Sequence, residues 1–217
     1  YYAKLGVKLE REDILATSGG GEALEFIMAC ILDDGDELLV PEPFYANYNT
    51  FTFMSGGVIH PIPTSADNGY RFADRKLIES QINERTRAIL VTNPGNPTGL
   101  VLTHEEMRVI ADVVKEHDLF LVADEVYREF IYDDEPMGTF CEMEDIKDHV
   151  IVVDSISKRF SACGARIGSI ISRNREFMAE AMKLCQGRLC TATLDQAGAA
   201  AMYEHVQPSY FKEVRDE

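Results

Sequence analysis

Residues 87–99 read Arg-Ala-Ile-Leu-Val-Thr-Asn-Pro-Gly-Asn-Pro-Thr-Gly, an apolar run that ends in a loop rich in proline and glycine. The run 87–92 is short and apolar at consecutive positions, which is typical of a strand buried on both faces. In the loop 93–99, two prolines and two glycines restrict the backbone, so the amide of Asn96 can be aimed at a ligand. A turn closed by an Asx bond is the alternative, but the number of constraints favours a functional loop.

Similar apolar runs recur along the chain, and amphipathic segments separate most of them. Further strands are expected at 13–17, 37–40, 57–62, 119–124, 150–154 and 166–171. Helices are expected at 22–32, 45–54, 74–82, 103–117, 174–187 and 192–205. This alternation predicts an α/β fold with a mostly parallel (mixed) sheet and helices on both faces.

The composition is that of a globular domain, since 46% of the 217 residues are apolar and 27% are charged. No stretch approaches the roughly 18 apolar residues that cross a bilayer. With 21 basic and 37 acidic residues the net charge is −16, which disfavours nucleic acid and anionic membranes as main partners. Five cysteines without a C-x-x-C pair indicate reduced thiols, and we expect a cytoplasmic protein.

Polar motifs directly follow four of the expected strands, where ligands bind in sheets of this kind. The first, residues 18–22, reads Ser-Gly-Gly-Gly-Glu and joins a strand to the start of a helix. Glycines allow close approach, and the first N–H groups of a helix attract anions, so this turn suits a phosphate. A plain tight turn is the commoner explanation, and no Walker lysine follows.

A second motif, Asp124-Glu125-Val126-Tyr127, ends a strand that is apolar enough to be buried. A carboxylate there costs free energy unless it is paired, either with a cationic ring nitrogen of a ligand or with a structural arginine. Nucleotide hydrolysis is disfavoured because the phosphate-loop lysine is missing. Metal binding is weaker still, since no histidine or third carboxylate lies close in sequence.

A third motif runs from Asp154 to Gly168 and contains Lys158 just past a buried strand. Such a lysine is a candidate for a lowered pKa and for nucleophilic amine chemistry. Two serines, Ser155 and Ser157, together with Arg166 could hold phosphate oxygens. An exposed lysine on a basic loop is the commoner case when this motif is taken alone.

In their order and spacing, the motifs resemble the class I/II aminotransferases, the aspartate aminotransferase family of fold-type I pyridoxal-phosphate enzymes. The resemblance spans nearly the whole chain and rests on residues 17–20, 43–45, 93–99, 124–127, 155–158 and 166–168. It implies that residues 1–217 form the cofactor-binding large domain. The N-terminal arm and the C-terminal small domain of the family are expected to lie outside this chain, whose two ends look cut.

The resemblance also implies a role for each matching residue toward pyridoxal 5'-phosphate. Lys158 would form the Schiff base, and Asp124 would pair with the pyridine nitrogen. Tyr127 and Asn96 would bind the 3-oxygen, and Tyr45 would stack on the ring face. The phosphate would be held by Gly20, Gly21, Ser155, Ser157 and Arg166. Catalysis would rest on Lys158, Asp124 and Tyr127.

The expected reaction is therefore amino transfer between an L-amino acid, with aspartate the leading choice, and a 2-oxo acid. The freed amine of Lys158 is the natural base to move a proton from the substrate Cα. A homodimer is expected from the resemblance. A lyase or decarboxylase on the same scaffold is one alternative, and a non-catalytic ligand-binding domain of a transcriptional regulator is another.

Several weaker features carry less information. The five histidines lack ligand spacing, so no metal site is expected. Cys163 lies close to Lys158 in sequence and could sit near the cofactor, although a small filler is the favoured interpretation. The acidic run 133–135 is interpreted as a solvated loop. Methionine and aromatic residues between 177 and 203 are expected in the core. Gly21 stands where the family often has a polar or cationic residue, which leaves the preferred substrate side chain open.

Overall fold

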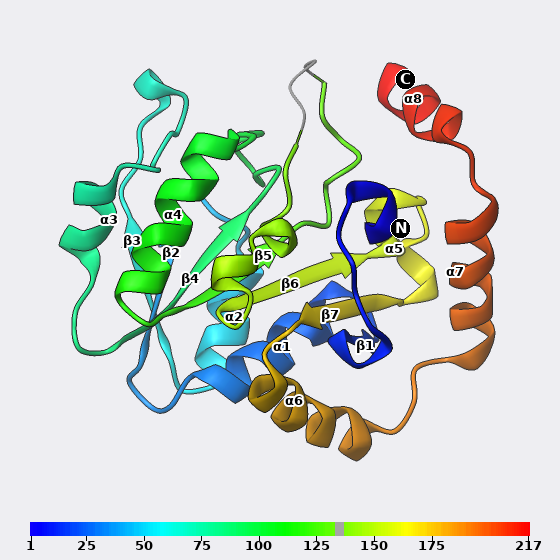
Figure 1. Cartoon of the computed structure of the whole chain (residues 1–217), viewed down its shortest axis with the longest axis horizontal. Coiled ribbons are helices and arrows are strands. Elements are labelled where there is room, and N and C mark those ends of the chain that lie inside the picture. Colours follow the sequence, from blue (N-terminus) through cyan, green and yellow to red (C-terminus); the bar gives the residue numbers. More distant parts are fainter. Residues whose placement is uncertain (133–136) are drawn as a thin grey trace.

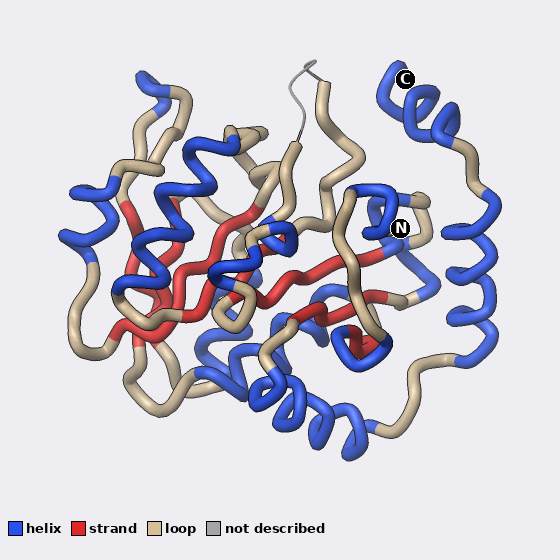
Figure 2. The backbone as a smooth tube through the Cα atoms, in the orientation of Figure 1, coloured by secondary structure: helices blue, strands red, loops and turns tan. Residues whose placement is uncertain are grey.

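The computed structural model describes residues 1–132 and 137–217, so the predicted acidic loop 133–135 lies outside the described residues. One seven-stranded sheet has the order β1-β7-β6-β5-β4-β2-β3 and crosses the middle of the molecule (Figures 1 and 2). The strands are β1 (Ile14–Thr17), β2 (Glu37–Pro41), β3 (Val58–Ile62), β4 (Thr86–Thr92), β5 (Phe120–Asp124), β6 (Val150–Ser155) and β7 (Gly168–Ser172).

Strand direction decides where the polar motifs meet. Only β7 runs antiparallel to its neighbours, β1 and β6, whereas the pairs β2–β3, β2–β4, β4–β5 and β5–β6 are parallel. The carboxyl ends of β1, β4, β5 and β6 therefore lie along one edge of the sheet, and β7 begins there. This edge is formed by the ends of the strands and not by an outermost strand. The predicted α/β fold with a mostly parallel, mixed sheet is confirmed.

Helices cover both faces of the sheet. The longer ones are α1 (Gly20–Ile31), α2 (Asn47–Met54), α3 (Arg75–Gln81), α4 (His104–Glu116), α6 (Arg175–Arg188), α7 (Thr193–His205) and α8 (Pro208–Asp216), and α5 (Ile156–Arg159) is a single turn. Short 3-10 helices occupy Tyr2–Leu5, Arg11–Asp13, Ala66–Asn68, Phe140–Glu142, Glu144–Ile146 and Cys163–Ala165. No helix among the described residues combines the length and the apolar character needed to cross a membrane.

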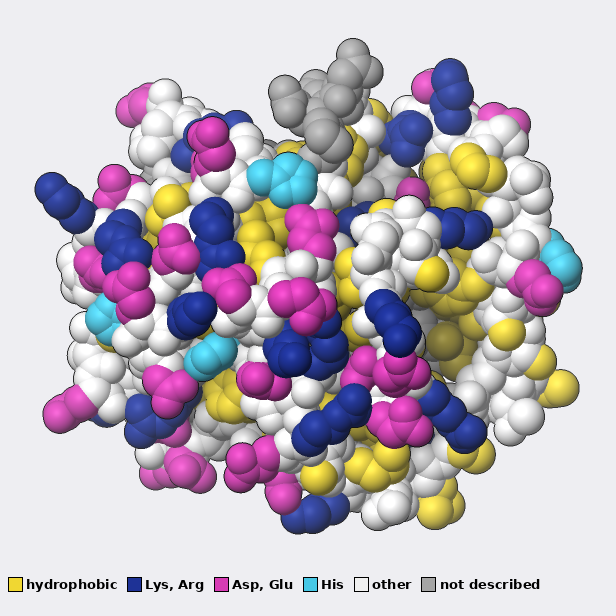
Figure 3. Space-filling model, viewed as in Figure 1, with side chains coloured by type: hydrophobic (Ala, Val, Ile, Leu, Met, Phe, Trp, Pro, Cys, Tyr) yellow, Lys and Arg dark blue, Asp and Glu magenta, His cyan; other side chains and the backbone are white. Residues whose placement is uncertain are grey.

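The strands alternate their side chains between two apolar cores. In β2, Leu38 and Val40 face the core formed with α1, α2 and α6, whereas Leu39 faces the core formed with α3 and α4. The same alternation in β4, β5 and β6 buries these strands on both sides, which explains why their sequences are continuously apolar. Over α3 and α4, acidic and basic side chains are interspersed on the outer surface (Figure 3).

The carboxyl-terminal part departs from the sequence expectation. Instead of two closing helices there are three, because Pro208 begins an additional helix, α8, whose Phe211 packs against Phe160. A small third core around Phe160 joins α7 and α8 to the body of the domain. Of the methionines and aromatics expected in the core, Phe177 and Met178 are buried, but Met182 is exposed.

Two local boundaries have clear physical causes. The helix α4 begins with the capping box, in which the Glu106 amide donates to Thr103 Oγ1 at 3.2 Å and the Thr103 amide donates to Glu106 Oε2 at 2.9 Å. The strand expected from 166 begins only at Gly168, because Arg166 takes the left-handed conformation with φ 52°.

The helix α1 starts at Gly20, two residues earlier than expected, where β7 passes very close to its first turn. A Cβ atom on Gly168 would lie 2.5 Å from the Gly19 carbonyl carbon and 2.8 Å from the Gly20 nitrogen, and neither backbone atom can move freely. Glycine at 168 is therefore required for the strand and the helix N-terminus to touch.

We expect Gly168→Ala to destabilise the protein by about 1–3 kcal/mol or more, because the added methyl group forces apart the backbones of β7 and α1. Urea denaturation measures the change. Gly198→Ala is the matched control, since nothing lies within 4 Å of a Cβ at this position in α7. The control should gain up to about 1 kcal/mol from better helix propensity. Equal stability of Gly168→Ala and the unchanged protein would contradict the close approach.

Candidate active site

A pocket of about 220 Å³ lies at the sheet edge where β4, β5 and β6 end. All ten predicted site residues line it, namely Gly20, Gly21, Tyr45, Asn96, Asp124, Tyr127, Ser155, Ser157, Lys158 and Arg166. The other lining residues are Leu24, Tyr48, Thr92, Val126 and Cys163. The structure thus brings residues from distant parts of the sequence into one space, while their individual roles stay predictions.

One end of the pocket has the features of an anion site. No side chain caps the start of α1, where Gly19 has φ 91° and supplies the N-cap. The Arg166 guanidinium lies against Gly19 and donates to the Ser18 carbonyl at 3.1 Å. The carboxylate of Glu22 in the same first turn pairs with Arg188 at 3.1 Å, so its charge is compensated. Uncapped N–H groups beside a guanidinium suit a phosphate.

The segment that carries Lys158 forms the neighbouring wall. The Ser155 hydroxyl lies 2.9 Å from the Ser157 hydroxyl and accepts from the Ser157 amide at 3.1 Å, which places both hydroxyls at the start of α5. Lys158 is half-buried, and its Nζ lies 5.8 Å from the centre of the Tyr127 ring. Ser161, like Arg166, has φ 52°, a strained conformation of the kind that gathers at functional sites.

The pocket lining also includes a buried carboxylate. Asp124 ends β5 and is 5% exposed; Tyr48 donates to its Oδ2 at 2.7 Å and the Val126 amide donates to its Oδ1 at 3.3 Å. No arginine or lysine forms a salt bridge with it within residues 1–132 and 137–217, which excludes the structural-arginine explanation for this part of the chain. Burial raises the pKa of Asp124 to about 6, although the two hydrogen bonds oppose the rise.

Tyr48 is a site residue that the sequence analysis missed. It is 1% exposed, and its hydroxyl lies 2.7 Å from Thr92 Oγ1 as well as from Asp124. Helical spacing from Tyr45 gave no signal, because Tyr45 lies before α2, which begins at Asn47. The Tyr45 ring stands edge-on to the Tyr48 ring, with centroids 5.5 Å apart.

The loop 93–99 presents Asn96 as predicted from its rigid neighbours. Its backbone closes on itself, since the Gly95 amide donates to the Leu100 carbonyl at 2.8 Å and the Gly99 amide to the Gly95 carbonyl at 2.9 Å. The Asn96 amide nitrogen donates to the Tyr127 hydroxyl at 3.2 Å. Two polar groups from neighbouring strand ends are thus held side by side on the pocket wall.

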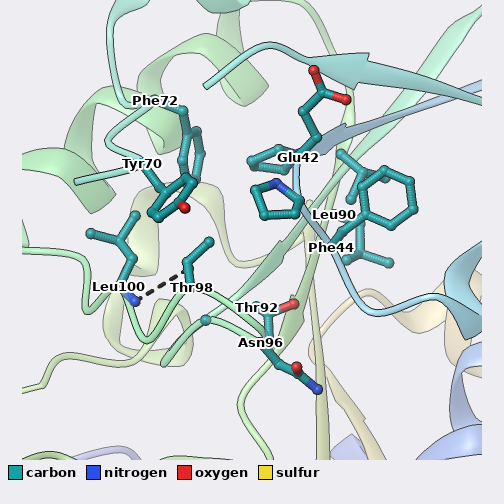
Figure 4. A pocket seen from close by; sticks show the side chains of 13 residues that line it. Glu42, Phe44, Tyr70, Phe72, Leu90, Thr92, Asn96, Thr98 and Leu100 are labelled. Atoms are coloured by element: carbon teal, nitrogen blue, oxygen red, sulfur yellow. Dashed lines mark hydrogen bonds between the residues drawn. The ribbon is translucent and has the colours of Figure 1, made fainter. Parts of the chain in front are cut away.

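A second cavity adjoins the pocket and shares Thr92 and Asn96 with it (Figure 4). The rings of Tyr70 and Phe72 lie at its far end, and Phe44 covers one side (Figure 4). Its volume is about 30 Å³, room for roughly two water molecules. This second cavity is too small for a cofactor, so the candidate site for a cofactor and substrate is the pocket that the predicted residues line.

Two weaker expectations can be compared with the structure. Cys163 is exposed on the pocket wall, where its thiol donates to the Ser157 carbonyl at 3.2 Å, so its interpretation as a small filler is wrong. Cys163 begins a 3-10 turn, Cys163–Ala165, in which no residue is buried, so there is no core for it to fill. Within the described parts of the chain, no three histidine, cysteine or acidic side chains gather as metal ligands would.

One pocket of a mixed α/β sheet thus gathers uncapped helix N–H groups beside a guanidinium, a lysine amine, and a buried acid that has no salt-bridge partner among residues 1–132 and 137–217. The family model "Aminotransferase class I and II" matches residues 1–217. The chain therefore belongs to the class I and II aminotransferases, whose aspartate aminotransferase members depend on pyridoxal 5'-phosphate.

Individual relatives agree with this membership. The chain is 33% identical over 159 residues to the aspartate aminotransferase of Pyrococcus abyssi, and the matched region covers 73% of this chain and 41% of that protein. It is 31% identical over 192 residues to aromatic-amino-acid aminotransferase 2 of Thermococcus litoralis, covering 88% and 49%. The crystal structure of the aromatic aminotransferase from Pyrococcus horikoshii superposes with a TM-score of 0.92 at 28% identity, covering 99% of this chain and 58% of that one. The chain spans about half the length of the curated relatives it matches.

In the cofactor-free protein, we expect Asp124→Asn to increase the free energy of unfolding above pH 6. Because the folded-state pKa of about 6 is raised, folding at higher pH keeps an ionised carboxylate buried. That costs on the order of 3 kcal/mol, and the cost disappears as the pH falls toward 4. Urea denaturation between pH 4.5 and 8 measures the difference.

The exposed Asp148→Asn variant is the control and should show no pH-dependent gain. A wild-type protein as stable as Asp124→Asn at pH 8 would show that the buried charge of Asp124 is compensated in the absence of cofactor.

Proposed function

We propose that the protein is a pyridoxal-phosphate-dependent aminotransferase that moves an amino group between an L-amino acid and a 2-oxo acid. The observation that carries the proposal is that Lys158 and the cation-free carboxylate of Asp124 line the same pocket. An amine for covalent attachment and an acid for a ring nitrogen are the two groups that this cofactor chemistry needs.

The pocket residues fit the cofactor from end to end. Gly20 and Gly21 amides, the Ser155 and Ser157 hydroxyls and Arg166 would hold the phosphate, which carries the charge that this wall favours. Tyr45 would cover the ring face, because it stands at the pocket wall and is 38% exposed. Tyr127 and Asn96 would bind the 3-oxygen through the polar pair described above.

When bound, the cofactor supplies a protonated ring that accepts the electrons released at the substrate Cα. Asp124 would keep that ring nitrogen protonated, and a cation beside Asp124 would remove the cost of its burial. The Lys158 amine, once displaced by the substrate, would take the proton from Cα and return it to the cofactor side. Its position beside Tyr127 places the base next to the phenol that would hold the ring oxygen.

Aspartate with 2-oxoglutarate is the first substrate pair to test, since relatives named aspartate aminotransferase are 30–33% identical to this chain. Membership of the family also supports a homodimer in the cytoplasm. Sedimentation of the full-length protein tests the dimer.

We expect Lys158→Ala to abolish covalent attachment of the cofactor. The full-length protein with added pyridoxal 5'-phosphate should show an absorbance band in the visible to near-ultraviolet, and borohydride should fix the cofactor on Lys158. The variant should show neither, because Lys158 is the only lysine among the described residues that line the pocket. Lys183→Ala, which removes a lysine that is 66% exposed on α6, is the control and should behave as the unchanged protein. Label retained at full yield by Lys158→Ala would refute the assignment.

We also expect a half-reaction with L-aspartate to convert the bound cofactor to its amine form and release one equivalent of oxaloacetate without ammonia. Absorbance of the cofactor and assays of both products follow this reaction across a panel of L-amino acids. Stoichiometric ammonia would instead indicate lyase chemistry. Absence of an oxo acid from every amino acid tested would rule out transamination.

A further inference from the structure

A fully buried arginine directly follows the proposed attachment lysine. The side chain of Arg159 is 0% exposed, although arginine is among the residues least often buried. It belongs to the four-residue helix α5, which begins where β6 ends. The mechanism proposed above assigns no role to this side chain, and its burial means that contact with water does not explain why an arginine stands here.

Arg159 is held by several segments that are far apart in the sequence. Its Nη1 donates to Asp154 Oδ2 at 2.6 Å and to the Tyr203 hydroxyl at 2.8 Å. Its Nε lies 3.5 Å from Glu129 Oε1, and the guanidinium lies 4.0 Å above the centre of the Tyr1 ring. The Tyr1 hydroxyl in turn donates to Glu129. One side chain thus connects β6, the segment after β5, α7 and the N-terminal segment.

Two of these partners adjoin residues of the candidate site. Asp154 accepts the Ser155 amide at 2.7 Å, and Glu129 lies two residues after Tyr127. Arg159 itself is the neighbour of Lys158. The guanidinium therefore sits behind the pocket wall, where it ties together the backbone segments that carry the phosphate-binding serine, the phenol and the amine.

The helix α5 cannot orient Lys158 by itself. It has four residues, which is too short to be stable without tertiary contacts. The strained left-handed conformation of Ser161 follows immediately. A buried ion pair is also weak evidence for a role in stability, because apolar replacements of such pairs are often neutral or stabilising. The arrangement is better explained if Arg159 fixes the direction of α5 and therefore of Lys158.

We propose that Arg159 is a positioning residue that fixes the direction of the Lys158 amine toward the cofactor aldehyde through its hydrogen bonds to Asp154 and Tyr203 and its ion pair with Glu129. This inference rests on the proposed function, since it assumes that Lys158 is the attachment amine. A lysine at 159 keeps the charge beside Asp154, but it lacks the planar guanidinium whose Nη1 faces Asp154 and Tyr203 while its Nε faces Glu129.

The test compares covalent attachment with non-covalent binding in the full-length protein. Attachment of pyridoxal 5'-phosphate, in which the Lys158 nitrogen forms a double bond to the aldehyde carbon and water leaves, is stopped with borohydride at successive times and measured on Lys158 by mass spectrometry. Affinity is measured with pyridoxine 5'-phosphate, which has no aldehyde and cannot bond to Lys158. Melting temperatures complete the set.

We expect Arg159→Lys to slow attachment at saturating cofactor by on the order of 10- to 100-fold, as a misdirected amine would, while affinity for pyridoxine 5'-phosphate stays unchanged. Arg173→Lys is the control, since Arg173 is also mostly buried but pairs with Glu144, away from the pocket. If Arg159→Lys does not fold, the double variant Asp154→Asn, Arg159→Met removes both charges together and is measured in the same way.

Attachment at the wild-type rate in the Arg159 variant would overturn the proposal. A parallel fall in attachment, analogue affinity and melting temperature would also overturn it, because it would show only general support of the fold. Failure of the unchanged protein to attach the cofactor at Lys158 would instead refute the proposed function, and the positioning role with it.

Discussion

The carboxylate of Asp124 is buried at the end of β5 with hydrogen bonds from one tyrosine and one backbone amide. Taking such a group out of water costs free energy unless a cation compensates it. Neutral donors compensate for only part of this cost, and the part that remains raises the pKa of Asp124 to about 6. The pocket is therefore preorganised for a ligand that brings a positive charge to this point. Tyr48 on α2 and the buried position of β5 both keep the Asp124 carboxylate away from water.

The sheet topology explains why the other groups lie within reach of Asp124. Parallel strands bring Asn96, Asp124 and Ser155 to one edge, because each residue lies at or just beyond a carboxyl end. The single antiparallel strand, β7, starts at the same edge and brings Gly168 against the first turn of α1. The start of α1, the proposed phosphate site, depends on that contact, which only a residue without a side chain permits.

Much of this arrangement could be predicted from local sequence. Apolar runs such as 87–92 and 150–154 identified the strands, and the polar motifs after them identified the pocket lining. Tyr48 and Arg159 were missed, because the partners of each lie far along the chain. Tyr48 reaches Asp124 across 76 residues, and Arg159 reaches Tyr203 across 44. No periodicity within one segment reports such contacts, and an arginine normally indicates a surface position.

Three buried acids near the same sheet edge show how the chain treats charge. Glu125 is bonded to Arg128, the Thr139 hydroxyl and the Phe140 amide, and Asp154 is paired with Arg159. Asp124, between them, has no cationic partner among the residues that the structure describes. The chain therefore supplies an arginine to each of these two buried acids, neither of which lines the pocket. Because it supplies none to the acid that faces the pocket, the missing charge there is best explained as one that the ligand brings.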